Sequence, residues 1–514
     1  MQVNNQKSYN REKTKLNNKS NKLLKYRNKR QLKAKRIMKN DLNQPTFYFH
    51  DYETFGINPA LDRPAQFAGV RTDGDFNIIE DPLVIYCQIA QDYLPNPEAV
   101  LITGITPQKA NQNGICEAEF TKQIYQAFSE PNTCILGYNN IRFDDEVTRN
   151  ILYRNFYDPY SYSWQNGNSR WDLLDVVRAC YALRPDGINW PINDNGLPSF
   201  RLEHLTQANN IKHEHAHDAM SDVYATIAMA KLIKEKQPKL FNYFFLLRNK
   251  NKVADLIDVV NMTPIIHVSG MLGSHRGNLS VVAPIIWHPI QNNAAVICDL
   301  AGDIDLLIDL SVEQIKEKLY TKTEDLELGE SRIPLKLIHT NKCPIVAPLK
   351  TLLPENAKRF GLDVEQCLIK LQKLQENQNL LQNKMQELFN IDNNYPINSD
   401  VDAQIYQGFL NNQDKLRCET IRTTPTQLLD SLSLTFDDPR LATLFFRYKA
   451  RNYPQALTER EQTIWYNYCR DKLNTPKIQD YLLNLELLAE TYIQQPEKLT
   501  IIKQLYNYCH YLVG

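Results

Sequence analysis

The region between Pro45 and Gln237 alternates short apolar runs with longer stretches whose apolar residues recur at helical spacing. The short runs, rich in β-branched and aromatic residues, predict strands at 47–52, 66–71, 83–88 and 133–136. The longer stretches predict helices at 119–128, 144–153, 173–183, 202–209 and 219–236. Strands that alternate with helices are typical of a layered α/β core, so we predict that fold class for this region.

The pattern changes after Pro238. Short strand candidates at 265–268, 280–283 and 295–298 are separated by Gly, Asn and Pro, which is typical of a small β-barrel. A segment rich in Leu, Gln and Lys at 363–391 predicts a helix, and a turn at 393–396 introduces a last, helical region. The predicted organisation is an N-terminal extension (1–44), an α/β domain (45–237), a barrel with a trailing helix (238–392) and a helical domain (393–514).

Composition adds a cellular context. Apolar residues make up 43% of the 514, enough for real cores, and no apolar run approaches the length of about 20 residues that a membrane helix needs. The chain shows no secretory signal. Its ten cysteines are scattered and form no C-x-x-C pair, which disfavours zinc and indicates reduced core residues. We therefore expect a cytoplasmic protein that does not bind membranes.

The net charge of zero hides an asymmetry between the two ends of the chain. Residues 1–37 contain 13 of the 59 bases and a single acid, Glu12, so the remainder carries a net charge of about −12. A body with that balance can bind nucleic acid only if its bases line one channel and metals offset its active-site acids. The basic segment itself is predicted to be disordered. Met38 is a candidate alternative start, and we favour an inert tail over a nucleic-acid-binding arm.

Candidate chemistry begins at the end of the first predicted strand, where Asp51 and Glu53 lie two residues apart. Residues at i and i+2 of a strand point to the same face, so the two carboxylates would project side by side. Two neighbouring acids repel each other and are costly to bury unless cations compensate them. The pair therefore indicates half of a two-metal site for phosphodiester chemistry, although a solvated strand end has the same pattern.

Three further residues follow in order. Asp144 sits at a turn-to-helix junction after the strand at 133–136, and Asp222 opens the helix at 219–236. His217 lies five residues before Asp222, so it shares no helix face with it and fits the preceding loop, poised as a general base. Each motif alone is also typical of a helix cap or of chance. The ordered set of four carboxylates and one histidine favours a site for Mg²⁺ or Mn²⁺.

The motifs D-x-E, N-x-x-F-D and H-x4-D resemble those of the DEDDh branch of the 3′→5′ exonucleases. The likeness extends to the bacterial exonuclease I family through segments without a catalytic role, so that it covers roughly residues 45–514. These segments are residues 50–56, 59–68, 101–107, 168–175, 267–271 and 339–344. The resemblance implies a ribonuclease H-like exonuclease core, an SH3-like barrel and a C-terminal helical domain.

The same resemblance implies processive 3′→5′ degradation of single-stranded DNA to nucleoside 5′-monophosphates, in DNA repair and recombination. Two Mg²⁺ ions, for which Mn²⁺ could substitute, would be held by Asp51, Glu53, Asp144 and Asp222, with Asp51 bridging them. His217 would deprotonate the attacking water. Substrate contacts are predicted at Glu53, Thr54, Phe55, Arg63, Gln66, Asn140 and Arg142.

Partners are also implied by the resemblance. Members of the family bind the acidic C-terminal tail of the single-stranded DNA-binding protein, and we expect a monomer associated with the nucleoid. Two other hypotheses stay open: an exoribonuclease that trims RNA 3′ ends, and an adaptor that binds single strands without catalysis. The long region after Gln237 disfavours the first, and the complete set of five site residues disfavours the second.

Two smaller features of the sequence are open to interpretation. The segment 444–453 interleaves bases with aromatic residues, as a single-strand-binding surface would, but an amphipathic helix explains it equally well. His275 stands where the family usually has a Trp, so a contact made by that Trp would be weakened. Neither feature affects a predicted catalytic position.

Overall fold

The computed structural model describes residues 45–213, 217–322, 325–326, 330–390 and 397–513. The chain divides into two units, Met1–Thr46 and Phe47–Gly514, and all contacts described below lie within the second. The predicted disordered extension at 1–44 and the predicted turn at 393–396 lie outside the described residues.

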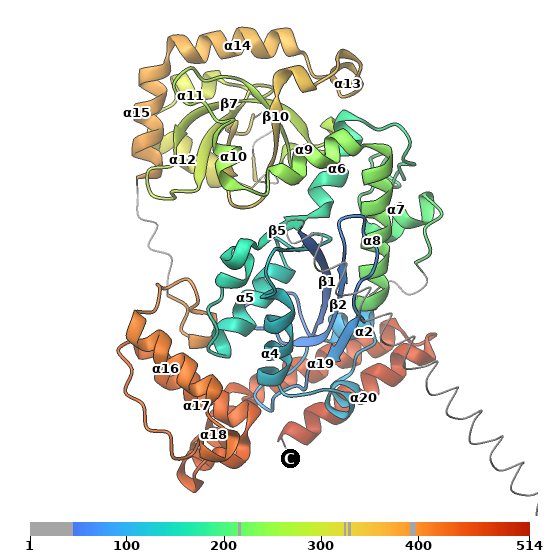
Figure 1. The fold of residues 1–514 in the computed structure, drawn as a ribbon, viewed down its shortest axis with the longest axis vertical. Helices are drawn as coiled ribbons and strands as arrows, with labels where there is room; N and C mark the ends of the chain where they lie inside the picture. Colours follow the sequence, from blue (N-terminus) through green and yellow to red (C-terminus); the bar gives the residue numbers. More distant parts are fainter. Residues whose placement is uncertain (1–44, 214–216, 323–324, 327–329, 391–396, 514) are drawn as a thin grey trace, which may run out of the picture. The chain divides into compact units, whose positions relative to one another are not determined.

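The first sheet contains the predicted acidic strand at its centre (Figure 1). Its strand order is β3-β2-β1-β4-β5, antiparallel from β1 through β3 and parallel between β4 and β5. The strands are β1 (Thr46–Thr54), β2 (Pro64–Thr72), β3 (Leu83–Tyr86), β4 (Thr133–Gly137) and β5 (Ser169–Asp172). Every residue of β2 is buried, as expected for a strand that is covered on both faces.

Helices cover both faces of this sheet. The helices of this part of the chain are α2 (Pro97–Thr103), α3 (Pro107–Asn113), α4 (Glu117–Phe128), α5 (Asp144–Arg154), α6 (Leu173–Leu183), α7 (Leu202–Ala208), α8 (Ala219–Lys236), α9 (Pro238–Leu246) and α10 (Lys250–Ala254), of which α10 lies beside the second sheet (Figure 1). Tyr48 and Tyr52 of β1 share a core with α4 and α5, whereas Phe47 and Phe49 share another with α6 and α8. The two-residue period of the strand therefore carries Asp51 and Glu53 to the α8 face.

The second sheet is antiparallel throughout, with the order β10-β6-β7-β8-β9. Its strands are β6 (Ile265–Val268), β7 (Leu279–Trp287), β8 (Ala294–Asp299), β9 (Leu335–His339) and β10 (Ile345–Pro348). The accompanying helices are α11 (Asp305–Asp309), α12 (Val312–Tyr320), α13 (Pro354–Arg359), α14 (Val364–Glu376) and α15 (Gln378–Phe389).

The prediction of one helix over 363–391 was wrong. Two helices, α14 and α15, meet at Asn377 and run in different directions (Figure 1). The Asn377 side-chain amide donates to the Lys373 carbonyl oxygen at 2.9 Å, so it takes a backbone acceptor that a continuing helix would use. Leu374 and Leu381 on either side of the break are both fully buried, so each helix keeps its apolar face on the barrel core.

The C-terminal region is helical, as predicted. It contains α16 (Asn412–Thr423), α17 (Pro439–Asn452), α18 (Glu459–Lys472), α19 (Thr475–Thr491) and α20 (Pro496–Val513). Leu485 of α19 and Leu505 of α20 share a core with Phe55 and Val100 of the first domain. Short 3-10 turns are η1 (Ser161–Ser163), η2 (Gln165–Gly167), η3 (Gly270–Leu272), η4 (Ser274–Arg276), η6 (Leu349–Thr351), η7 (Val401–Ala403), η8 (Thr426–Leu428) and η9 (Pro454–Ala456).

All ten cysteines are free thiols. Within the described residues, no helix combines the length and apolar character needed to cross a membrane.

Candidate active site

Three of the predicted acids converge beside the end of β1. Asp51 and Glu53 lie on one face of the strand, and Asp222 lies in the first turn of α8. One carboxylate oxygen from each of them lies within 4.8 Å of the other two. Oxygen atoms gathered at that spacing match the ligand set of a hard divalent cation. The sequence motifs D-x-E and H-x4-D therefore meet in space, although they are about 170 residues apart.

Asp144, the fourth acid, reaches the same strand from α5. It is the first residue of that helix, is 5% exposed, and accepts a hydrogen bond from the Tyr52 backbone N–H at 3.1 Å. Tyr52 lies between Asp51 and Glu53, so this bond fixes Asp144 alongside both. The loop before it is braced by Asp172, which accepts hydrogen bonds from the backbone N–H groups of Asn139 and Ile141.

The electrostatics of these acids are unfavourable without a cation. Burial, followed by the charges of Asp144 and Glu53, holds the pKa of Asp51 well above its usual value. Burial and then the charges of Asp222 and Asp144 raise the pKa of Glu53 to about 9. Burial is also the main cause that raises the pKa of Asp144, to about 8. The charges that act most strongly on Asp51 and Glu53 are all carboxylates, so the site fits a divalent cation that supplies the missing positive charge.

His217 lies in the turn before α8, where the sequence analysis expected it. Its φ angle is +66°, an uncommon value for a residue other than glycine, and its side chain is exposed. Its backbone N–H donates to Asp222 Oδ2 at 3.3 Å. The backbone contact ties His217 to the acid cluster and leaves the imidazole open to solvent. The role of that imidazole as a general base stays a prediction.

A second histidine, His213, was not predicted for the site. Its Nε2 lies 2.6 Å from Asp222 Oδ1, and its side chain is 4% exposed. Histidines at 213, 215 and 217 are a visible signal in the sequence, but the H-x4-D spacing selected only His217.

Four of the predicted substrate contacts have buried side chains in this structure. Phe55 and Asn140 are fully buried, Gln66 is 2% exposed and Arg63 is 3% exposed. Arg63 donates to Asp402 of the C-terminal domain at 2.9 Å, and Asn140 accepts from the Gly137 N–H at 3.0 Å. Their internal contacts give these side chains a structural role, and their contact with DNA stays a prediction.

The other three predicted contacts have a different setting. Glu53 belongs to the acid cluster, and the hydroxyl of Thr54, just after it, donates to the Gly56 carbonyl at 2.6 Å. Arg142 is exposed and lines a cavity of about 560 Å³ together with Lys342 and Tyr406. Their contact with DNA stays a prediction.

The basic and aromatic segment at 444–453 forms α17, and its bases are used inside the protein. Arg451 pairs with Asp92 and Asp402, each at 2.7 Å, and Lys449 pairs with Glu461 at 2.6 Å. The aromatic and aliphatic side chains of the segment that are buried are Leu444, Phe445 and Tyr448. The structure therefore favours the amphipathic-helix interpretation over a single-strand-binding surface.

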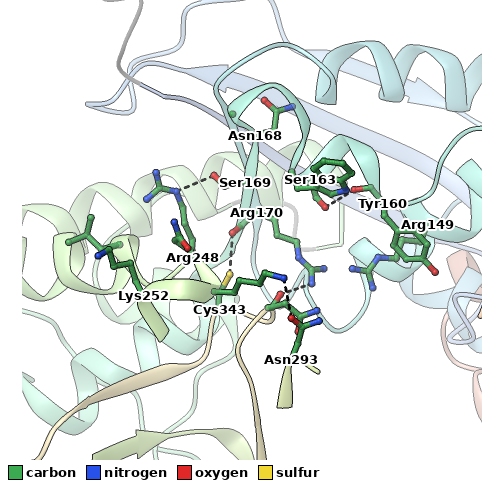
Figure 2. Close-up of a pocket in the computed structure, with 16 residues that line it drawn as sticks. Arg149, Tyr160, Ser163, Asn168, Ser169, Arg170, Arg248, Lys252, Asn293 and Cys343 are labelled. Atoms are coloured by element: carbon green, nitrogen blue, oxygen red, sulfur yellow. Dashed lines mark hydrogen bonds between the residues drawn. The ribbon is translucent and has the colours of Figure 1, made fainter. Parts of the chain in front are cut away.

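A basic cavity of about 570 Å³ opens between the first domain and the barrel (Figure 2). Its bases are Arg149, Arg170, Arg248, Lys250 and Lys252, and its aromatic residues are Tyr160 and Trp164. Arg170 is held by Asp145, and Arg248 Nε donates to Ser169 Oγ at 3.1 Å. Trp164 is 62% exposed. Positive charge beside an exposed aromatic ring is the combination that binds single-stranded nucleic acid.

A second cavity of about 750 Å³ shares Tyr160, Trp164 and Lys250 with the basic one. It adds Phe409, whose side chain is 85% exposed, and six further bases or aromatic residues: Tyr153, Phe156, Tyr157, Lys415, Arg422 and Arg440. The two cavities together form a continuous lining of cations and rings, which we call the basic–aromatic groove. His275, at the position of the family Trp, is exposed on η4 and lines neither cavity.

A mixed sheet that gathers four carboxylates at the end of its central strand defines a divalent-metal-dependent nuclease with a ribonuclease H-like fold. Family models agree along the chain: "Exonuclease" matches residues 48–230, "Exonuclease I SH3-like domain" residues 248–391 and "Exonuclease I C-terminal domain" residues 399–512. The chain belongs to the exonuclease I family.

Individual relatives are similar over nearly their whole length. Exodeoxyribonuclease I of Haemophilus influenzae is 53% identical over 470 residues, 91% of this chain and 99% of the relative. The Escherichia coli K12 enzyme is 53% identical over 477 residues, 93% of this chain and 100% of the relative. The crystal structure of E. coli exonuclease I in complex with a dA16 oligonucleotide superposes with a TM-score of 0.90 at 53% identity, covering 91% of this chain and 100% of that one.

Proposed function

We propose that the chain is a 3′→5′ exodeoxyribonuclease that degrades single-stranded DNA and releases nucleoside 5′-monophosphates. The observation that carries this proposal is the convergence of Asp51, Glu53 and Asp222 within 4.8 Å, with Asp144 beside them, in a member of the exonuclease I family. Relatives at 53% identity are named exodeoxyribonuclease I, and solved relatives hold DNA oligonucleotides.

The carboxylates Asp51, Glu53, Asp144 and Asp222 would hold two Mg²⁺ ions, for which Mn²⁺ could substitute, with Asp51 shared between them. Bound cations in such sites supply Lewis acidity and neutralise charge on the attacking and leaving oxygens. His217 would accept the proton of the attacking water, which its exposed position next to Asp222 allows. The leaving group is the 3′-oxygen of the penultimate nucleotide.

The basic–aromatic groove would hold the rest of the strand. Phosphates would contact Arg248 and Lys250, and bases would stack on Trp164 and Phe409. Stacking needs unpaired bases, so this groove favours single strands over duplex. Contacts to several nucleotides at once keep the strand bound between cleavage steps, and this supports processive digestion.

Partners and place follow from the family. Solved relatives include an "ExoI/SSB-Ct complex" with a TM-score of 0.87 at 53% identity, which covers 92% of this chain and 100% of that one. We therefore propose that this chain binds the acidic tail of the single-stranded DNA-binding protein. It would act as a monomer in the cytoplasm at the nucleoid, with domain boundaries near residues 45, 237 and 392.

The decisive experiment uses matched oligonucleotides labelled at either end, with Mg²⁺ or with EDTA. We expect mononucleotides from the 3′ end of single-stranded DNA, and no hydrolysis in EDTA. Preferential digestion of the matching RNA would support the exoribonuclease instead. Tight DNA binding without any hydrolysis in Mg²⁺ would support the adaptor.

A further inference from the structure

His213 lies in the connection between α7 and α8, and both nitrogens of its imidazole have fixed partners. Nε2 lies 2.6 Å from Asp222 Oδ1, and Nδ1 lies 3.1 Å from the hydroxyl of Thr206. The side chain is 4% exposed, so solvent does not compete for these contacts. The contact with Thr206 of α7 therefore fixes the orientation of the His213 ring. The opposite side of the ring contacts the Asp222 carboxylate.

The support behind His213 is rigid. Thr206 is 1% exposed, and its hydroxyl lies 2.9 Å from the Leu202 carbonyl oxygen one turn earlier in α7. The chain leaves α7 through Asn210, whose φ angle is +54°, and the Ile211 N–H then donates to the Thr206 carbonyl at 2.8 Å. This hydrogen-bonded turn fixes the position of His213 relative to α8.

Asp222 needs such support because its neighbours repel it. Its carboxylate oxygen lies within 4.8 Å of those of Asp51 and Glu53, and an unrestrained aspartate would rotate away from them. Among the described residues, Asp222 Oδ2 accepts a 3.3 Å bond from the His217 N–H. The shorter bond from a buried, braced imidazole is the stronger restraint.

We propose that His213 is a positioning residue, which donates its Nε2–H to Asp222 and holds that carboxylate in the orientation that binds metal. Carboxylates that bind metals are commonly oriented by such hydrogen bonds, whose loss costs about 10–100-fold in metal affinity or activity. The inference rests on the proposed metal role of Asp222. It assigns the two histidines different tasks: His217 acts with its side chain on water, and His213 acts through Asp222.

The test compares Mn²⁺ binding by isothermal titration calorimetry with kcat and KM on a single-stranded oligonucleotide. We expect His213→Ala to weaken Mn²⁺ binding by about 10–100-fold, to lower kcat at subsaturating metal and to leave KM for DNA unchanged. His213→Gln keeps an N–H donor and recovers part of the affinity. The matched control is His204→Ala, which removes a nearby histidine, within α7, whose partner is Ser199 and not an acid.

Two further variants separate positioning from a merely structural role. Thr206→Val removes the brace but not His213, and should weaken Mn²⁺ binding less than His213→Ala does. In the double variant with Asp222→Asn, loss of His213 should have no additional effect on metal binding. Wild-type Mn²⁺ affinity in a folded His213→Ala variant, or additive losses in the double variant, would overturn the inference. Wild-type hydrolysis in EDTA would instead overturn the proposed function.

Discussion

Two of the regions in which the molecule buries carboxylates differ in their neighbouring charges: arginine and lysine side chains surround one group, whereas other carboxylates surround the other. Beside the C-terminal domain, Asp92 and Asp402 are fully buried among Arg63, Arg451 and Lys472. Although burial alone would raise it, Arg451 and Arg63 hold the pKa of Asp402 well below its usual value. At the end of β1 the neighbouring charges are carboxylates, so they add to the effect of burial and raise the pKa of Glu53 to about 9.

The difference separates a structural charge cluster from a functional one. Buried carboxylates with arginine partners are neutralised inside the fold and need nothing else. Buried carboxylates whose neighbours are other carboxylates are stable only when protonated or when a ligand supplies cations. Perturbed pKa values alone do not mark an active site, but their direction, together with the neighbours that cause it, supports the proposed site here.

The largest expected effect comes from removing one acid of the uncompensated cluster. Asp51→Asn should lower kcat by more than about 100-fold, because even residues that only orient metal ligands contribute up to that factor. The same variant should raise the melting temperature in EDTA, because it removes a repelled buried charge. Oligonucleotide digestion and differential scanning calorimetry measure the two effects. A variant with wild-type kcat would contradict the assignment of this site.

Removing an acid of the cluster formed by Asp92 and Asp402, which basic side chains neutralise, should instead lower the stability of the protein. Asp402→Asn removes a charged partner that the buried Arg63 and Arg451 share, and should cost about 3–5 kcal/mol of stability, measured by urea unfolding. The matched control is Asp437→Asn, because Asp437 pairs with Arg417 at 3.0 Å but is 54% exposed. An exposed pair is worth about 1 kcal/mol or less. Equal losses of unfolding free energy in Asp402→Asn and Asp437→Asn would contradict the expected difference between buried and exposed ion pairs.

The pH dependence of stability should also differ between the regions. Glu53 and Asp144 have pKa values raised to about 9 and about 8, so the folded metal-free protein keeps protons that the unfolded chain has lost. Stability in EDTA should therefore fall as the pH rises from about 4.5 to 9. The lowered pKa values of Asp92 and Asp402 make the other cluster lose stability only at acidic pH, below the usual range of aspartate.

Melting temperatures between pH 5 and 9, with EDTA and with Mg²⁺, provide the measurement. Saturating Mg²⁺ should flatten the decline, because deprotonated carboxylates bind the cation more tightly. An equally steep decline in Mg²⁺ would show that these acids are not its ligands.

The smallest effect is expected in the basic–aromatic groove. Its bases give it an excess of positive charge, whereas the acid cluster has an excess of negative charge. Lys250 donates to Asn293 at 3.2 Å and forms no ion pair with an acid among the described residues. Lys250→Ala should reduce the slope of log affinity against log salt for single-stranded DNA by about 0.7. Fluorescence anisotropy in EDTA at several salt concentrations measures this slope, with Lys239→Ala, an exposed lysine of α9, as the control. An unchanged slope would show that the single-stranded DNA does not contact Lys250 in this groove.

Much of the first domain could be predicted because its periodicity is strong. The runs at 47–52 and 133–136 lie in β1 and β4, and the helices at 144–153 and 219–236 match α5 and α8 closely. The helices α2 and α3 were missed, although Asn96 before Pro97 and Thr106 before Pro107 are cap signals that could have found them. The strand β5 was missed because it has four residues, two of them charged.

The site residues could be predicted only where their spacing along the sequence indicates their positions. Asp51 and Glu53 follow from the two-residue period of a strand, and Asp222 from the start of a helix. The burial of Arg63 could not be predicted, because its partner Asp402 lies 339 residues further along the chain. His213 escaped for a similar reason, since its bond to Asp222 depends on the turn after α7 and not on a motif.

The packing of α19 and α20 against the first domain has a consequence for biosynthesis. Phe55, two residues beyond Glu53, shares its core with Leu505 and Tyr508, which lie about 450 residues further along the chain. A growing chain on the ribosome therefore contains Asp51 and Glu53 long before α19 and α20 have been synthesised. The core around Phe55 can close only after both helices are available to pack against it.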